Sequence, residues 1–194
     1  MTWVDWIAAV VLGVEWPIPL FWLVVHPLAG FWRGRMRLAY WVAGLAAWGA
    51  GLPLVFFLSE WLFVAEQATT GQRVAGFLLL AFDAGVLLRV EQELGVHRLV
   101  GQAELTGSGE LHTHGLYARV RHPRYTAMMA GVLGACLMAG SLLMWVLSMA
   151  WWFLALLATM FEERELRMRF GIAYAEYSRR VPRFLPFRVW SQEH

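Results

Sequence analysis

Residues 126–161 read TAMMAGVLGACLMAGSLLMWVLSMAWWFLALLATMF and contain no Asp, Glu, Lys or Arg. As one helix this stretch would rise roughly 54 Å at about 1.5 Å per residue, whereas the hydrocarbon core of a bilayer is only about 30 Å thick. We therefore predict two membrane helices joined by a tight hairpin. Ala139-Gly140-Ser141 is the best turn signal within the stretch.

The composition of the whole chain also indicates a membrane protein. Of its 194 residues, 59% are hydrophobic and 15% are charged, whereas soluble domains carry roughly 25% charged residues. The basic residues are all Arg and the net charge is only +2, so we expect no nucleic-acid partner. Cys136 is the single cysteine, which excludes an internal disulfide and a thiolate metal site. We expect no metal.

Further apolar stretches predict an all-α integral membrane protein with five spanning helices. They cover residues 6–25, 38–62, 73–92, 125–139 and 142–162. We expect a single membrane domain, residues 1–194, in which residues 1–92 supply three spans and residues 93–194 form the functional core. All Arg residues except Arg73 fall on one side of this topology. The positive-inside rule then places the N-terminus outside and the C-terminus in the cytoplasm, at the inner membrane if the cell is bacterial.

Residues 162–180 are expected to form a C-terminal amphipathic helix at the membrane interface. Apolar and aromatic side chains recur there at helical spacing. Glu163 with Arg167, and Glu165 with Arg169, have the i,i+4 spacing of helical ion pairs. Gly171 is expected to interrupt this helix or to end it.

The hairpin returns both of its ends to one membrane face, so His122 and Tyr125 are expected to lie beside Glu162 and Glu163. Ionisable groups at a membrane are costly unless they are paired, and they indicate a functional site by default. A purely structural interpretation is equally compatible with these residues alone. In that interpretation the arginines anchor the topology, the glutamates cap a helix and His122 makes an ordinary hydrogen bond.

A resemblance favours the functional interpretation. Residues 115–125 read GLYARVRHPRY and residues 161–186 read FEERELRMRFGIAYAEYSRRVPRFLP. In combination, G-x-Y-x-x-x-R-H-P-x-Y, the double Glu, F-G-x-x-Y-x-x-Y and R-F-L-P resemble the isoprenylcysteine carboxyl methyltransferase family and its phospholipid methyltransferase relatives. The resemblance covers over a third of the chain. It implies membrane helices and a cytoplasmic loop and site that bind S-adenosylmethionine.

The resemblance also implies which residues contact this methyl donor. They are Gln102, Gly109, Glu110, Leu111, His112, Tyr117, His122, Pro123, Arg124, Tyr125 and Glu162. The sequence departs from the family at Gly109 and His112, where we expect backbone contacts. It departs again at Ala158, where isoprenylcysteine enzymes place an Arg on the substrate side. We therefore expect poor recognition of a prenylated cysteine carboxylate, and an Arg at position 158 is expected to improve it.

The residue types suit methyl transfer. The donor carries a sulfonium cation, an ammonium group, a carboxylate, ribose hydroxyls and an adenine, so its pocket needs carboxylates, cations and aromatic walls. The catalytic candidates are His122, Tyr125 and Glu163. A thiol or amine acceptor must lose a proton, which His122 or Glu163 can take, whereas a carboxylate acceptor needs no base. We expect a lipophilic acceptor that enters sideways from the lipid bilayer.

Two other functions stay open at this point. Sterol reductases have a similar R-H-P-x-Y pattern and use NADPH, but they have about twice as many spans. A non-catalytic lipid-binding protein is the other alternative, although it has no need of His122, Tyr125 and Glu162. The acceptor is equally open, between an isoprenylcysteine, a phospholipid amine, a small thiol and another lipophilic acid.

Overall fold

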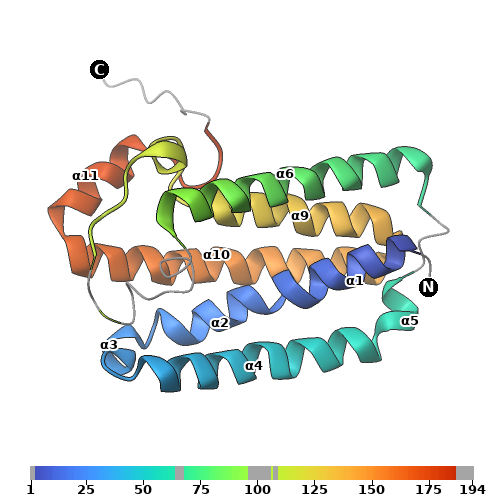
Figure 1. The fold of residues 1–194 in the computed structure, drawn as a ribbon, viewed down its shortest axis with the longest axis horizontal. Helices are drawn as coiled ribbons and strands as arrows, with labels where there is room; N and C mark the ends of the chain where they lie inside the picture. The colour runs from blue at the N-terminus through green and yellow to red at the C-terminus, as the bar shows by residue number, and fades with distance from the viewer. Residues whose placement is uncertain (1–2, 64–67, 96–105, 107–108, 187–194) are drawn as a thin grey trace.

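A computed structural model describes residues 3–63, 68–95, 106 and 109–186, and within these ranges the regular structure is entirely helical. The helices are α1 (Trp3–Glu15), α2 (Pro17–Val25), α3 (Ala29–Trp32), α4 (Met36–Phe57), α5 (Ser59–Leu62), α6 (Thr70–Leu94), η2 (Gly115–Ala118), α9 (Pro123–Ala139), α10 (Leu142–Phe170) and α11 (Ile172–Arg180). Figure 1 shows that the long helices run side by side along the long axis of the molecule.

Three helical segments in the described part of the chain are long and apolar enough to cross a membrane. They are Trp3–Val25, Arg37–Phe57 and Leu142–Phe170. The first combines α1 and α2, which meet at Trp16 because Pro17 starts the second helix. Helices α6 and α9, which were also predicted to span, do not meet the same criterion. These three are the candidate membrane-spanning helices of the described part of the chain.

The hairpin between α9 and α10 forms where the sequence predicted it. Gly140 ends α9 in the left-handed conformation, with φ of 70°, which glycine adopts without steric cost. Ser141 then caps α10, because its Oγ atom accepts a hydrogen bond from the backbone N–H of Met144 at 3.1 Å. The same hydroxyl donates to the carbonyl of Leu62 at 2.9 Å. The turn is thereby fixed to the end of α5.

Close packing of α9 against α6 depends on glycines. A Cβ atom at Gly134 would lie 2.7 Å from the carbonyl oxygen of Gly76, and one at Gly131 would lie 2.7 Å from Oδ2 of Asp83. Asp83 in turn shares a hydrogen bond with the buried Glu15 of α1. Small residues and one polar pair therefore hold α1, α6 and α9 together, as polar groups commonly do within membrane helix bundles.

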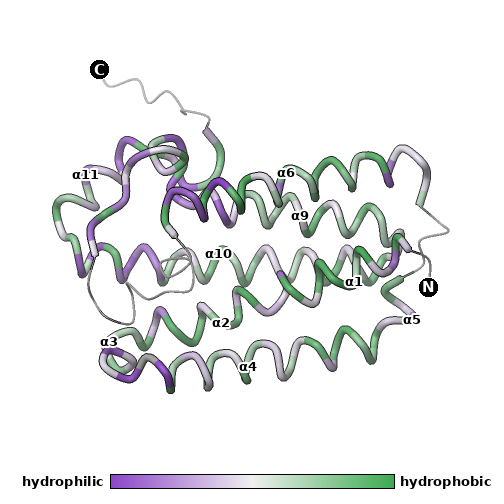
Figure 2. The backbone as a smooth tube through the Cα atoms, viewed as in Figure 1, coloured by the Kyte–Doolittle hydropathy of each residue, from purple (hydrophilic) through white to green (hydrophobic). Residues whose placement is uncertain are grey.

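The prediction that a separate interfacial helix begins at residue 162 is wrong. Helix α10 continues without a break through Glu162 to Phe170, and only Gly171, with φ of 54°, separates it from the short α11. Ion pairs between Glu163 and Arg167 at 3.4 Å, and between Glu165 and Arg169 at 3.7 Å, span the extended part. Figure 2 shows the consequence: hydrophilic residues gather at one end of the bundle, around α3, α11 and the C-terminal turns of α10.

Candidate functional site

His122 lies between two carboxylates at this polar end. It directly precedes Pro123, the first residue of α9, whereas Glu162 and Glu163 belong to α10. Its Nδ1 atom is 3.5 Å from Oε2 of Glu162, and its Nε2 atom is 3.2 Å from Oε1 of Glu163. The expectation that the hairpin makes these residues neighbours is confirmed.

The two carboxylates favour the charged form of His122. The side chain is buried, and burial by itself lowers the pKa of an imidazole. The charge of Glu162 and the hydrogen bonds to both carboxylates outweigh burial and raise the pKa of His122 above its usual value. Both nitrogens of an imidazolium donate hydrogen bonds, which suits a carboxylate on either side of the ring.

Glu163 is enclosed by arginines. Arg183 donates to both carboxylate oxygens, from Nε to Oε1 at 2.9 Å and from Nη2 to Oε2 at 2.7 Å. Arg121 lies 3.3 Å from Oε1 and Arg167 lies 3.4 Å from Oε2. The Glu163 side chain is only 1% exposed. Its charge is therefore balanced, and its oxygens point at protein groups.

The segment after α11 packs along the backbone on either side of the start of α9. The backbone N–H of His122 donates to the carbonyl of Arg183 at 3.0 Å, and the N–H of Arg121 donates to that of Pro182 at 2.8 Å. The Thr126 hydroxyl donates to the carbonyl of Phe184 at 2.9 Å. The R-F-L-P motif therefore lies along the start of α9, where it fixes the backbone that carries His122.

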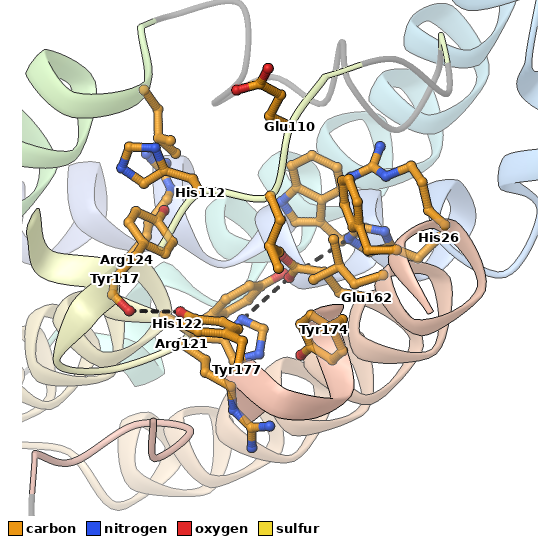
Figure 3. Close-up of a pocket in the computed structure, with 17 residues that line it drawn as sticks. His26, Glu110, His112, Tyr117, Arg121, His122, Arg124, Glu162, Tyr174 and Tyr177 are labelled. Carbon is orange, nitrogen blue, oxygen red and sulfur yellow. Dashed lines mark hydrogen bonds and ion pairs between the residues drawn. The ribbon is translucent and has the colours of Figure 1, made fainter. Parts of the chain in front are cut away.

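A cavity with about 940 Å³ of empty space, part of it open to solvent, lies beside His122 (Figure 3). Eight of the residues expected to contact the donor line it: Glu110, Leu111, His112, Tyr117, His122, Arg124, Tyr125 and Glu162. They come from the loop before α9, from η2, from the start of α9 and from α10. The structure thus gathers most of the expected contacts around one cavity.

The other expected site residues lie elsewhere. Gly109, Pro123 and Glu163 do not line the cavity. Pro123 instead starts α9, and Glu163 faces the arginines. Gln102 lies outside the described residues.

Nine lining residues were not among the expected contacts: Trp22, His26, Leu94, Arg121, Leu166, Arg169, Phe170, Tyr174 and Tyr177. The motif F-G-x-x-Y-x-x-Y contains three of them, and Arg121 is the first residue of R-H-P-x-Y, so those motifs held a usable signal. Trp22 and His26 lie near the end of the first span, and no sequence pattern pointed to them.

Three tyrosines of the cavity are protonated at neutral pH. Burial is the main cause that raises the pKa of Tyr117, Tyr174 and Tyr177, the last to about 12. The Tyr177 hydroxyl donates to the carbonyl of Tyr117 at 2.7 Å and so joins α11 to η2. These phenols therefore act as hydrogen-bond donors and aromatic surface, while Glu162, His122 and the arginines are charged groups of the cavity.

Ala158 does not line the cavity, although it packs beside Tyr125, which does. It is 0% exposed and packs in an apolar cluster with Tyr125, Met128, Trp151 and Ala155. An Arg at this position would place a charge in that cluster. The expectation that Ala158→Arg improves carboxylate recognition therefore has no support in the packing of this chain.

The described geometry can be compared with known proteins. A family model described as phospholipid methyltransferase matches residues 72–173, just over half of the chain. The matched segment runs from the start of α6 to the start of α11 and includes the hairpin, His122, Glu162 and Glu163. No curated protein and no solved structure matches the chain.

Proposed function

Because the chain belongs to the phospholipid methyltransferase family, we propose that it is an S-adenosylmethionine-dependent integral membrane methyltransferase that acts on a lipophilic or amphiphilic acceptor. The observation that carries this proposal is the cavity at the polar end of the bundle, into which Glu162 projects beside His122. The side chain of Glu162 is 24% exposed, whereas that of His122 is 2% exposed. Glu162 is therefore the member of the pair that can meet a ligand.

The cavity fits the chemistry of the donor. Its lining combines acidic, basic and aromatic side chains. Its carboxylates suit the sulfonium and the ammonium, its arginines suit the carboxylate, and its tyrosines suit the adenine. Two polar atoms of cavity residues, Oη of Tyr174 and Nδ1 of His26, are buried without a hydrogen-bond partner among the described residues. Buried polar atoms normally have partners, so these two leave room for groups of a ligand.

S-adenosylmethionine, when bound, supplies an electrophilic methyl group on a sulfonium. In this proposal the Glu162 carboxylate balances that positive charge, and His122 holds the carboxylate in place. Glu163 holds His122 in turn, and the arginines around Glu163 keep the Glu163 carboxylate ionised. The aromatic residues of the lining cover part of the cavity wall with apolar surface. Alignment of the two reactants then accounts for most of the rate, since transfer is an in-line displacement.

The role of Glu163 in this proposal is to position His122. Three arginines already surround its carboxylate, so it is poorly placed to accept a proton from an acceptor. We therefore assign the uptake of any acceptor proton to the cavity side of the site, to the Glu162 carboxylate, because the two carboxylates favour the protonated form of His122. Tyr125 contributes an aromatic wall next to the His122 ring, with ring centroids 6.0 Å apart.

We also propose that all five long segments cross the membrane with the N-terminus outside. Support comes from α9, which packs against the apolar helices α1 and α10, and from α6, which packs against α9 along the same bundle (Figure 1). The cavity then faces the cytoplasm, where the donor is made, and residues 93–194 carry most of its lining. Acceptor lipids reach it from the bilayer.

A phospholipid amine is our preferred acceptor over a prenylated cysteine carboxylate. The family description supports it. The test incubates the purified protein in vesicles with methyl-labelled donor and measures label in the lipid. Vesicles of phosphatidylethanolamine are compared with vesicles of phosphatidylglycerol that contain a farnesylcysteine analogue. Labelling of the amine lipid, lost in Glu162→Ala and kept in the distant, exposed Glu60→Ala, is expected. Absence of label with both acceptors contradicts the proposal.

A further inference from the structure

Two histidines contact the same oxygen atom of Glu162 from opposite sides. His122 Nδ1 lies 3.5 Å from Oε2, and His26 Nε2 lies 3.9 Å from that same atom. Figure 3 shows the two rings on either side of the Glu162 carboxylate. His122 lies within the family match, whereas His26 caps the end of α2 and lies outside it. The N-terminal helices therefore contribute a side chain to a group in the matched segment.

His26 differs from His122 in its surroundings. Its side chain is 2% exposed, and its ring stacks on Trp22 with centroids 4.8 Å apart and an angle of 18°. Burial lowers the pKa of His26 to about 4, although Glu162 opposes this. The two rings thus differ in their preferred form: the carboxylates favour the charged form of His122, whereas burial favours the neutral form of His26.

The neutral ring can still donate a hydrogen bond. Nδ1 of His26 has no hydrogen-bond partner in the described part of the chain, so the tautomer with the proton on Nε2 directs its N–H toward Glu162. The separation of 3.9 Å is longer than a hydrogen bond, which for nitrogen and oxygen is about 2.7–3.2 Å. A movement of roughly 1 Å by the partly exposed Glu162 side chain closes that gap.

We infer that His26 is a positioning residue, contributed by the N-terminal helices, that fixes the Glu162 carboxylate for the methyl donor. Trp22 holds the ring of His26 in place by stacking. His26 then limits the movement of the Glu162 carboxylate on the side opposite His122. This inference rests on the proposed function, in which the Glu162 carboxylate binds the methyl donor S-adenosylmethionine. It assigns a part in donor binding to a segment that the family match does not include.

The test uses two variants of His26 in the full-length protein in detergent. His26→Phe keeps an aromatic ring against Trp22 but removes the N–H, whereas His26→Gln keeps an N–H at a similar reach. We expect His26→Phe to raise the dissociation constant and the KM for S-adenosylmethionine about tenfold, with the KM for the acceptor unchanged within about twofold. We expect His26→Gln to restore donor binding to within about threefold of the parent.

A double-mutant cycle with Glu162→Gln separates an effect through Glu162 from a direct contact with the donor. If His26 acts through that carboxylate, His26→Phe changes donor binding less than twofold once Glu162 is replaced. Additive effects overturn the inference. So does a folded His26→Phe variant that binds the donor like the parent, or an equal loss of binding and thermal stability in both His26 variants. Failure of the parent to bind the donor removes the proposed function itself, and this inference falls with it.

Discussion

Arg183, in the segment that follows α11, donates two hydrogen bonds to the Glu163 carboxylate, at 2.9 Å and 2.7 Å. The paired geometry matches the planar fork of a guanidinium to the two oxygens of a carboxylate. Glu163 then contacts His122, and His122 contacts Glu162 in the cavity. The position of the C-terminal segment is thereby linked, through three side chains, to the group that we expect to meet the donor.

The first prediction tests this link. Arg183→Ala leaves a buried carboxylate with fewer donors and should lower the free energy of unfolding by about 1–3 kcal/mol. Arg183→Lys keeps the charge without the fork and should lose less. Thermal unfolding in detergent measures both, and the exposed Arg180→Ala serves as control. Equal stability of Arg183→Ala and Arg180→Ala would show that the pairing adds nothing to stability.

The second prediction concerns the pH dependence of folding stability that His122 causes. Its pKa is raised in the folded protein, so the folded state binds the proton more tightly than the unfolded chain does. The resulting stabilisation is complete below the unfolded pKa of about 6.5 and is lost as the pH rises through the higher folded pKa. The Tm of the parent should fall over that range more than the Tm of His122→Gln. Parallel pH profiles would contradict a charged His122.

The third prediction concerns His26, whose effect on stability changes with pH in the opposite direction. Its pKa in the folded protein is about 4, below the unfolded value of about 6.5. The unfolded chain therefore takes up the proton first, and stability falls as the pH drops from about 6.5 toward 4. His26→Phe should lose less stability than the parent over this interval. An equal acid slope in both proteins would show that His26 is not buried in its neutral form.

The fourth prediction concerns Ala158. Ala158→Arg introduces a charge into an apolar cluster and should destabilise the protein by several kcal/mol, on the order of 3–5. It should not create methylation of a farnesylcysteine analogue. Ala173→Arg, on the exposed face of α11, should leave stability within about 0.5 kcal/mol. A stable Ala158→Arg protein with new activity on the analogue would show that position 158 reaches the substrate.

The sequence predicted the features of the site that depend on local signals. Gly140 and Ser141 have the residue types that end one helix and begin the next, and an uncharged stretch of that length requires the turn between them. The contact of His122 with Glu162 and Glu163 follows directly from that geometry.

Other features depend on contacts between distant segments and could not be predicted from local patterns. Arg183 reaches Glu163 only because the chain reverses after α11, and His26 reaches Glu162 only because α2 packs against α10. The error in the helix over 162–180 has a different cause. The charged residues predict an end of the membrane helix, but Glu163 pairs with Arg167 and Glu165 with Arg169 along the helix, which continues to Phe170.

The central claim is that Glu162 contacts S-adenosylmethionine, and equilibrium binding of the donor to detergent-solubilised protein tests it most directly. The parent and Glu60→Ala should bind the donor with the same affinity. Glu162→Ala should bind it more weakly by about 1–3 kcal/mol, which is roughly a 5- to 150-fold rise in the dissociation constant. No binding by the parent, or binding by Glu162→Ala as tight as that of the parent, would contradict the claim.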